Sequence, residues 1–360
     1  MTPDRIDVTS ASHTYPVFVA PGLIGELSRW LTEAGIGERR FLVSSPAVWR
    51  HHGDTFVEAL PGVEHLLVSD GERSKTQQTL GKVYEWLIRN EADRRSTVVA
   101  VGGGVIGDTV GFAAATFLRG VPLVQIPTTL LAQVDSAVGG KVGINHALGK
   151  NLIGAFHAPS AVIADPTLLD TLPRRELRVG LYEVVKYGVI ASRTLFDRLV
   201  DDLPRIFGRE PEVLVEIVAA SCRIKAEVVM ADEREGDRRR VLNFGHTAGH
   251  ALEAATRYRR LRHGEAVAYG MLVAARLGVM RGLFESGDET ALGDLIGRMG
   301  PLPQVSDLPA SGILSVMRRD KKVADGRLHM VLPNGLGDTV IVDDVSDRDI
   351  RRALKVIGVR

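Results

Sequence analysis

The first half of the chain alternates short apolar segments with segments of helical periodicity. Residues 6–22 alternate apolar and polar side chains as strands do, and residues 23–36 show helical spacing that ends near a glycine. Further short apolar segments lie at 41–45, 65–70, 97–104 and 122–129, and a helical segment lies at 79–92. Strands that alternate with helices of this length predict an α/β domain with a parallel sheet.

The second half is mainly helical in pattern. Long helical segments are expected at 174–192, 211–231 and 264–280, and residues 326–342 predict a strand pair around an Asn-Gly turn. We therefore predict two domains: an α/β nucleotide-binding domain over residues 1–172 and a mostly α-helical domain over residues 173–360.

Composition narrows the class of protein. The 360 residues are 45% hydrophobic and 25% charged, which is typical of a globular protein long enough for two domains. The 45 Lys and Arg nearly balance the 44 Asp and Glu, so the net charge of +1 does not favour nucleic-acid binding. One cysteine, no signal-peptide pattern and no apolar run near the roughly 20 residues of a membrane span predict a cytoplasmic protein that does not bind a membrane.

Three consecutive glycines mark the first candidate site. In residues 99–115 a buried strand enters Gly102, Gly103 and Gly104 and leaves as a helix, a geometry that suits a phosphate or pyrophosphate. The motif differs from G-x-G-x-x-G, and Asp108 follows one turn into the helix. A tight turn without a ligand is the alternative.

The stretch 125–159 carries the second candidate site. Thr128 and Thr129 stand where a parallel strand is expected to end, the edge at which open α/β sheets bind ligands. Polar residues that could surround a small anion follow among glycines: Asp135, Lys141, Lys150 and Asn151.

Glu183 and Lys186 lie in a segment that is apolar on nearly every side. Burying unpaired charges is costly, so we interpret Glu183 as a metal-ligand carboxylate. The alternative is an ordinary ion pair between residues three apart on a helix surface.

His246 and His250 are four residues apart, so they project from one face of a helix. Thr247 stands where a zincin would have glutamate, which excludes the metalloprotease pattern. His246 and His263, with the carboxylate of Glu183, would form a two-His, one-Glu site with open coordination positions, as in catalytic zinc sites. The spacing does not decide whether His246, His250 or both bind the metal. Lys225 and Arg239 are basic residues that suit a phosphate-bearing substrate.

Seven blocks, in order along the chain, resemble the signature blocks of the 3-dehydroquinate synthases in the sugar phosphate cyclase superfamily. They span residues 102–120, 125–145, 149–159, 183–188, 242–253, 263–271 and 320–322. The resemblance implies a homodimeric lyase of the shikimate pathway that uses NAD and a divalent metal, usually zinc with cobalt as an alternative. It implies conversion of 3-deoxy-D-arabino-heptulosonate 7-phosphate to 3-dehydroquinate and phosphate by transient oxidation, phosphate elimination, reduction, ring opening and aldol closure.

The resemblance also implies residue roles, which divide into three groups. The metal ligands are Glu183, His246 and His263. The substrate-site residues are Asp135, Lys141, Asn151, Lys186, Lys225, Arg239, Asn243, His250 and Lys321, with Arg119 reaching the active site of the neighbouring subunit. The cofactor-binding residues are Glu72, Lys75, Gly103, Gly104, Asp108, Thr128, Thr129, Lys141 and Lys150.

One departure from the family pattern concerns the adenosine ribose. Many members carry an acidic or amide residue where this chain has Ser44, Ser45 and Pro46. Two alternatives of similar architecture stay open: a cyclase for another sugar phosphate, and a metal-dependent polyol dehydrogenase that would release NADH. A binding protein without catalytic activity is the least favoured class, since it would leave the buried ionisable residues without a purpose.

Overall fold

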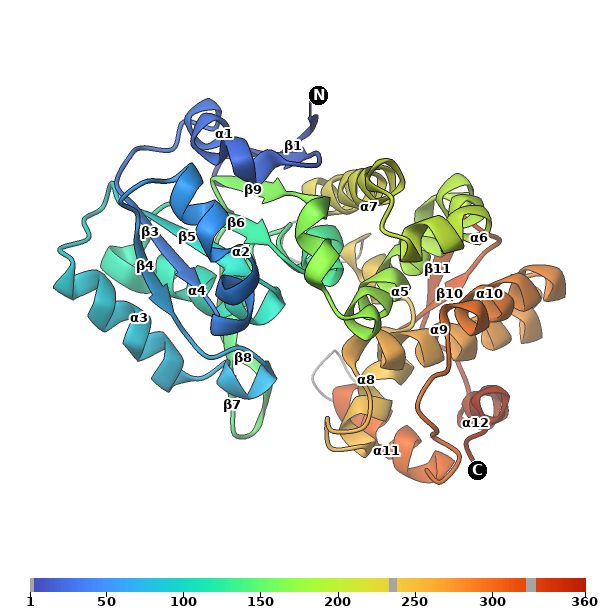
Figure 1. The fold of residues 1–360 in the computed structure, drawn as a ribbon. Coiled ribbons are helices and arrows are strands. Elements are labelled where there is room, and N and C mark those ends of the chain that lie inside the picture. Colours follow the sequence, from blue (N-terminus) through green and yellow to red (C-terminus); the bar gives the residue numbers. More distant parts are fainter. Residues whose placement is uncertain (1–2, 233–237, 322–327) are drawn as a thin grey trace. The chain divides into compact units, whose positions relative to one another are not determined.

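The computed structural model describes residues 3–232, 238–321 and 328–360, with Arg238, Asp320 and Lys321 described by their backbone alone (Figure 1). The chain forms two compact units. The first contains Met1–Leu177 and Gly208–Glu233, and the second contains Arg178–Phe207 and Arg234–Arg360. None of the described helices has the length and apolar character that crossing a membrane requires.

A seven-stranded sheet forms the centre of the first unit. Its spatial order is β1-β2-β9-β6-β5-β3-β4, and every pairing is parallel except that of β1 with β2. The strands are β1 (Asp4–Thr9), β2 (Thr14–Val19), β3 (Arg40–Ser44), β4 (Glu64–Leu67), β5 (Thr97–Gly102), β6 (Leu123–Pro127) and β9 (Ala161–Ala164).

Helices cover both faces of this sheet because alternate strand residues point to opposite sides. Leu42, Val99 and Val101 pack in one core with residues of η1, α1 and α2. Their neighbours Val98 and Ala100 pack in a second core with residues of α3 and α4. The helical segments are η1 (Leu23–Glu26), α1 (Leu27–Glu33), α2 (Pro46–Ala59), η2 (Glu72–Ser74), α3 (Gln77–Arg89), α4 (Gly104–Thr116), η3 (Phe117–Arg119), η4 (Ala132–Ser136) and η5 (Pro166–Thr171).

The strand order reverses between β3 and β5. The chain leaves β3 toward β4 on one side, whereas it leaves β5 toward β6 on the other. In open α/β sheets, ligands bind outside the carboxyl ends of the two strands that flank such a switch point. Here those ends are Ser44 and the glycine turn at Gly102.

Two further elements complete the first unit. The hairpin of β7 (Lys141–His146) and β8 (Gly149–Phe156) packs through β7 against α4. Helix α7 (Pro211–Ala231) returns from later in the chain and packs against β1, β2 and η4.

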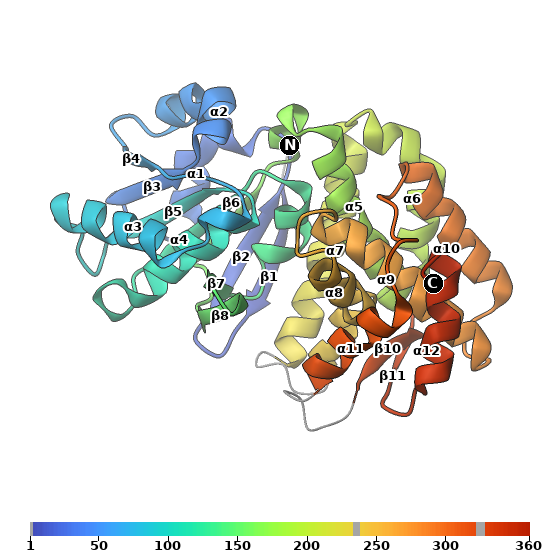
Figure 2. The same ribbon diagram turned by 90° about the horizontal axis from the view of Figure 1, so that it is seen from below.

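The second unit is mostly helical. Helices α8 (His246–Ala255) and α9 (His263–Met280) pack side by side, as Figure 2 shows. The other helical segments are α5 (Arg174–Ala191, from Arg178 onward), α6 (Arg193–Phe207), η6 (Arg238–Asn243), α10 (Ser286–Met299), α11 (Ala310–Lys321), α12 (Asp347–Leu354) and η7 (Lys355–Ile357). Strands β10 (Met330–Pro333) and β11 (Thr339–Val342) pair antiparallel.

The structure confirms the predicted fold class, an α/β domain followed by a mainly helical one, and the predicted strand pair near the C-terminus. The segment at 23–36 begins as a 3₁₀ turn before α1, so it is less regular than its periodicity indicates. The chain first passes between the units within α5, near the predicted boundary at residue 172, and residues 208–233 then return to the first unit. The division into domains 1–172 and 173–360 stays a prediction.

Candidate functional site

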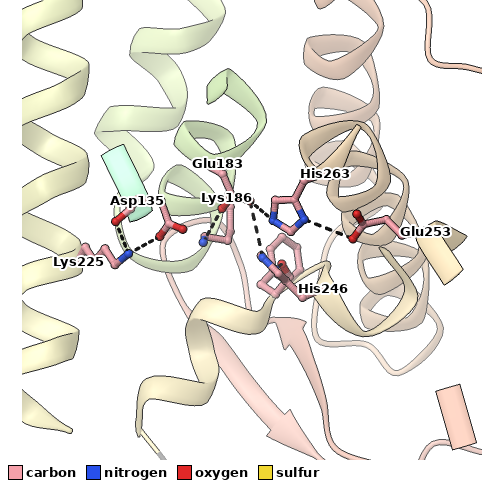
Figure 3. A network of polar contacts seen from close by, with 8 residues as sticks. Asp135, Glu183, Lys186, Lys225, His246, Glu253 and His263 are labelled. Carbon is pink, nitrogen blue, oxygen red and sulfur yellow. Dashed lines mark hydrogen bonds and ion pairs between the residues drawn. The ribbon is translucent and has the colours of Figure 1, made fainter. Parts of the chain in front are cut away.

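Two histidines and one glutamate, from three separate elements of the second unit, lie together (Figure 3). Glu183 of α5 has its Oε1 atom 3.4 Å from His263 Nε2 and 3.7 Å from His246 Nε2. The potential ligand atoms of the three residues all lie within 4.8 Å of one another. Two imidazole nitrogens and a carboxylate oxygen are donors that Zn²⁺ and Co²⁺ accept, and three protein ligands leave a position for water or substrate. The donor set therefore fits a divalent metal.

Glycines let the three helices approach closely enough for this meeting. A Cβ atom on Gly270 of α9 would lie 1.7 Å from the Gly245 carbonyl oxygen, just before α8. A Cβ atom on Gly264 of α9 would lie 2.2 Å from the Val179 carbonyl oxygen of α5. Only glycine fits at such contacts. Because His246 begins α8 and His263 begins α9, the same contacts bring the two imidazoles toward α5.

Glu183 is also paired with Lys186. The Lys186 Nζ atom lies 2.6 Å from Glu183 Oε2, and both side chains are buried. The sequence left two interpretations of Glu183: a metal ligand, or a member of an ion pair between residues three apart. The structure contains the ion pair, but in the interior, where Oε1 still faces the histidines. Removing one partner of a buried pair typically costs about 3–5 kcal/mol, because the other charge is left uncompensated.

The two histidines of the group have opposite pKa shifts. Burial lowers the pKa of His246 to about 3, although Glu183 opposes the shift. Burial also acts to lower the pKa of His263, but hydrogen bonds to Glu183 and Glu253 outweigh it and raise that pKa to about 10. The protein without metal thus holds its positive charge on His263, between two carboxylates.

His250 lies beside this group. Its ring centroid is 5.3 Å from that of His246 and 5.9 Å from that of His263. His250, Glu253 and His263 form a second group of potential ligands within the same distance limit as the first. Of the two groups, the one around Glu183 is built on the more buried residues, whereas His250 is exposed.

A second set of polar contacts lies in the first unit. Lys75, buried after η2, places its Nζ atom 2.6 Å from Asp108 Oδ2 and 2.5 Å from Asn151 Oδ1. Burial raises the pKa of Asp108, and the Lys75 ammonium opposes this shift. Glu72 accepts a hydrogen bond from Asn145 Nδ2 at 2.7 Å. These five polar residues thus lie together at Asn145 and Asn151 of the β7–β8 hairpin, within a few residues of its turn.

The glycine turn lies at the switch point of the sheet. A Cβ atom on Gly103 would lie 3.0 Å from Thr129 Cγ2, and one on Gly104 would lie 3.0 Å from Ser136 Oγ. Helix α4 begins at Gly104, and its N-cap residue Gly103 provides no side-chain cap for the first amide N–H groups. Thr128 donates its backbone N–H to the Gly102 carbonyl at 3.0 Å. The turn therefore places the backbone N–H groups at the start of α4 beside the two threonines.

Asp135 and Lys225 form a further pair in the first unit. Lys225 Nζ, on α7, lies 2.6 Å from Asp135 Oδ1 and 2.5 Å from the Asp135 carbonyl oxygen. Asp135 belongs to the π-helical turn η4, a distortion that is frequent at functional sites.

The serines at the end of β3 have structural partners. Ser44 donates its hydroxyl to the Val101 carbonyl at 2.9 Å, and Ser45 caps α2 by accepting from the Val48 N–H at 3.4 Å. Both are fully buried. The two serines at which this chain departs from the expected family pattern therefore have internal partners.

The remaining predicted residues lie in varied environments. Arg239 is buried in η6, the element that Asn243 ends. Lys141 and Arg119 are exposed, and Lys150 is half-buried. Lys321 ends α11, and its side chain lies outside the described residues.

Two residues in contact with these groups were missed from the sequence. Glu253 lies 3.4 Å from His263 Nδ1, and Asn145 links Glu72 to Asn151 by accepting the Asn151 N–H at 2.9 Å. Both occur in the blocks that carry the family resemblance. Glu253 follows His246 by two helical turns, a spacing that could have placed it on the same face.

Comparison with known proteins decides the family. Residues 65–179 match the family model of the 3-dehydroquinate synthase N-terminal region, and residues 180–323 match that of the C-terminal region. The 3-dehydroquinate synthase of Solibacter usitatus (strain Ellin6076) is 44% identical over 351 residues, 97% of this chain and 98% of the relative. The chain belongs to the 3-dehydroquinate synthase family.

Solved structures of similar proteins support the fold of the family. The 2-epi-5-epi-valiolone synthase of Streptomyces hygroscopicus subsp. jinggangensis 5008, with NAD⁺ and Zn²⁺ bound, matches with a TM-score of 0.89 and 30% identity over 99% of both chains. A 2-deoxy-scyllo-inosose synthase complexed with carbaglucose-6-phosphate, NAD⁺ and Co²⁺ matches with a TM-score of 0.85 and 26% identity over 98% of this chain and 100% of the other. The 3-dehydroquinate synthase fold of this chain is thus shared with other sugar phosphate cyclases.

Proposed function

We propose that the chain catalyses the reaction of its family, the conversion of 3-deoxy-D-arabino-heptulosonate 7-phosphate to 3-dehydroquinate and phosphate. The observation that carries the proposal is the meeting of Glu183, His246 and His263 in a chain that is 44% identical to a 3-dehydroquinate synthase over nearly its whole length. Identity to the valiolone and inosose synthases is lower, which favours this reaction over that of another cyclase.

In this proposal Glu183, His246 and His263 would hold the metal, and the switch point of the sheet would hold NAD. When bound, these two groups supply transient oxidation of a ring hydroxyl and polarisation of its oxygen. The chain's own residues hold the cofactor. The N–H groups of the glycine turn and of the start of α4 would bind the pyrophosphate. Lys75, Asp108, Thr128 and Thr129 lie around the turn and the hairpin and complete the cofactor site, together with Glu72, Lys141 and Lys150.

The basic residues hold the substrate's negative charge. Arg239 is buried, and its planar guanidinium can bind a phosphate through two parallel hydrogen bonds. Lys225 is held by Asp135, and Lys186 by Glu183, so each ammonium has a defined position. Asn151, Asn243, His250 and Lys321 complete the proposed substrate site. Charge held in fixed positions stabilises the leaving phosphate without reorganisation.

The protein acts as a homodimer in this proposal, with Arg119 reaching the neighbouring subunit. Arg119 is exposed, and both it and Leu118 have positive φ angles, 71° and 48°. Side chains other than glycine rarely adopt this conformation, and it persists where a site requires it.

The test is an incubation with the heptulosonate phosphate, NAD and Zn²⁺. We expect release of phosphate without net NADH absorbance, and mass spectrometry should identify 3-dehydroquinate. Accumulation of NADH would instead indicate the polyol dehydrogenase. Turnover of glucose 6-phosphate, whose carba-analogue is bound in the inosose synthase structure, in place of the heptulosonate would indicate another cyclase.

Variants assign the ligands in the same assay. Glu183→Gln, which preserves side-chain volume, should abolish both stoichiometric metal and activity. His246→Ala should also lose the metal, whereas His250→Ala should retain it and lose activity. Glu289→Ala is the control, because this carboxylate of α10 pairs at 2.9 Å with Arg276, which lies more than three turns along α9 from His263. Metal loss in His250→Ala with retention in Glu183→Gln would show that the second group binds the ion.

A further inference from the structure

Each ring nitrogen of His263 faces a different carboxylate. Nε2 lies 3.4 Å from Glu183 Oε1, and Nδ1 lies 3.4 Å from Glu253 Oε2, as the dashed lines in Figure 3 mark. Glu253 is 4% exposed and belongs to the last turns of α8. A buried carboxylate is costly unless it is hydrogen-bonded, so the contacts of Glu253 are what make its burial possible.

His246 is held in the same way as His263. Its Nδ1 atom lies 3.1 Å from the Phe244 carbonyl oxygen, while its Nε2 atom faces Glu183. Glu183 is the third proposed ligand, so a metal held with it would take the lone pair of each Nε2 and leave the ring proton on Nδ1. There the Phe244 carbonyl and the Glu253 carboxylate can only accept a hydrogen bond.

We propose that Glu253 is a positioning residue of the metal site: it accepts the Nδ1–H of His263 and so fixes the tautomer and ring orientation in which Nε2 binds the metal. The inference rests on the proposed assignment of Glu183, His246 and His263 as ligands. Histidine ligands commonly donate their other N–H to a carboxylate or a backbone carbonyl, and these partners raise the basicity of the ligand. In this site His263 has the carboxylate and His246 the carbonyl.

The competing role for Glu253 is that of a ligand in the group with His250 and His263. In that arrangement Nδ1 of His263 would bind the ion and could not donate to Glu253. Two observations favour positioning. His246 shows the matching arrangement, with Nδ1 on an acceptor and Nε2 toward Glu183, and His250 is exposed whereas Glu183 is fully buried.

Two substitutions at Glu253 separate these roles. Glu253→Leu keeps the volume of the side chain but removes the acceptor, so metal affinity should fall by about 10- to 100-fold. Glu253→Gln keeps an acceptor oxygen and should restore most of the affinity. Glu289→Gln is the matched control and should bind metal as the wild type does. The measurement is calorimetric titration of the metal-free proteins with Zn²⁺, and thermal unfolding without metal checks that each variant is folded.

The Co²⁺-loaded proteins provide a second readout. Glu253→Leu should shift the visible absorption of bound Co²⁺ and lower kcat more than it raises KM, because the ligand geometry changes while the substrate contacts remain. If Glu253→Leu fails to fold, Glu253→Gln carries the test: near-normal affinity supports the acceptor role, and a loss of metal contradicts it.

The outcomes distinguish this inference from the proposed function. Wild-type affinity in a folded Glu253→Leu protein would show the inference wrong while leaving the three ligands in place. Loss of stoichiometric metal in both Glu253→Gln and His250→Ala, with metal retained in Glu183→Gln, would make Glu253 a ligand. If the wild-type protein binds no metal, that result would instead contradict the proposed function on which the inference rests.

Discussion

At the scale of single residues, buried charges in the second unit are held by specific partners. Glu183 pairs with Lys186, and Glu265, which is fully buried, lies 3.3 Å from Arg178. Glu265 also accepts the backbone N–H that precedes α9, so it helps to fix the start of the helix that carries His263. A buried ionic group is weak evidence for stability, because apolar residues could often fill the same volume at less cost.

His157 provides a test of pH-dependent stability in the first unit. Burial lowers the pKa of His157, although its Nε2 atom lies 3.0 Å from the Val121 carbonyl oxygen. Because the folded pKa is below the unfolded value of about 6.5, the unfolded chain binds more protons as pH falls. The contribution to stability is therefore complete above about pH 6.5 and is lost as pH falls from there toward the folded pKa.

Urea unfolding of the wild type and of His157→Gln between pH 8 and pH 5 measures this contribution. We expect the free energy of unfolding of the variant to fall less steeply with decreasing pH, because glutamine does not titrate. His146→Gln, at an exposed position, is the control and should retain the wild-type slope. Equal slopes in wild type and His157→Gln would contradict the prediction.

At the scale of elements, the crossing of α8 and α9 determines the metal group. The two helices meet where Gly270 of α9 lies against the carbonyl of Gly245, and Gly249 of α8 against that of Ala266. Gly245 has a φ of 78°, in the left-handed region, so the chain can turn sharply into α8. The histidines project from the starts of these helices, and their separation depends on the glycine contacts.

Gly270→Ala should therefore damage both the fold and the site. Its methyl group would overlap the Gly245 carbonyl, and we expect a loss of about 3 kcal/mol or more in the free energy of unfolding, together with weaker Zn²⁺ binding in any folded fraction. Gly293→Ala on α10 is the control, because a Cβ atom there meets nothing within 4 Å. The free energy of unfolding of that variant should be unchanged or higher by up to about 1 kcal/mol. Thermal and urea unfolding provide the comparison, and equal stability of the two variants would refute the argument.

At the scale of the whole molecule, the chain passes between its two units more than once. Helix α7 belongs to the first unit although it follows α6 of the second. It brings Lys225 to Asp135 and places the Cys222 Sγ atom 3.2 Å from the Gln133 carbonyl oxygen. The proposed substrate residues are consequently divided between units that do not correspond to the two halves of the sequence.

The proposed homodimer predicts complementation between inactive variants. If Arg119 acts in the neighbouring subunit, a mixed dimer of Arg119→Ala and Glu183→Gln contains one site with both defects and one intact site. Random mixing of equal amounts should then restore about one quarter of wild-type activity. The measurement is phosphate release after unfolding and refolding the two variants together, with each refolded alone as control. Absence of recovery in proteins that refold as dimers would place Arg119 in its own subunit's site.

The sequence by itself determined the kinds of element and the family. Periodicity identified the buried strand before Gly102, the long helices and the C-terminal strand pair, since the spacing of apolar residues follows directly from local geometry. The seven blocks identified the family, and they contained Glu253 and Asn145 without indicating their contacts. Apolar spacing shows which face of an element is buried but not which other face it meets.

Only the tertiary structure decided how those faces meet. It brought Glu183 to two histidines far along the chain, aimed both Nε2 atoms at one oxygen, and assigned α7 to the first unit. It also gave Ser44 and Ser45 internal partners. The physical reason is that these contacts depend on how closely helices and strands can approach one another. That distance is controlled by backbone contacts at particular glycines, and the local spacing of apolar residues does not encode it.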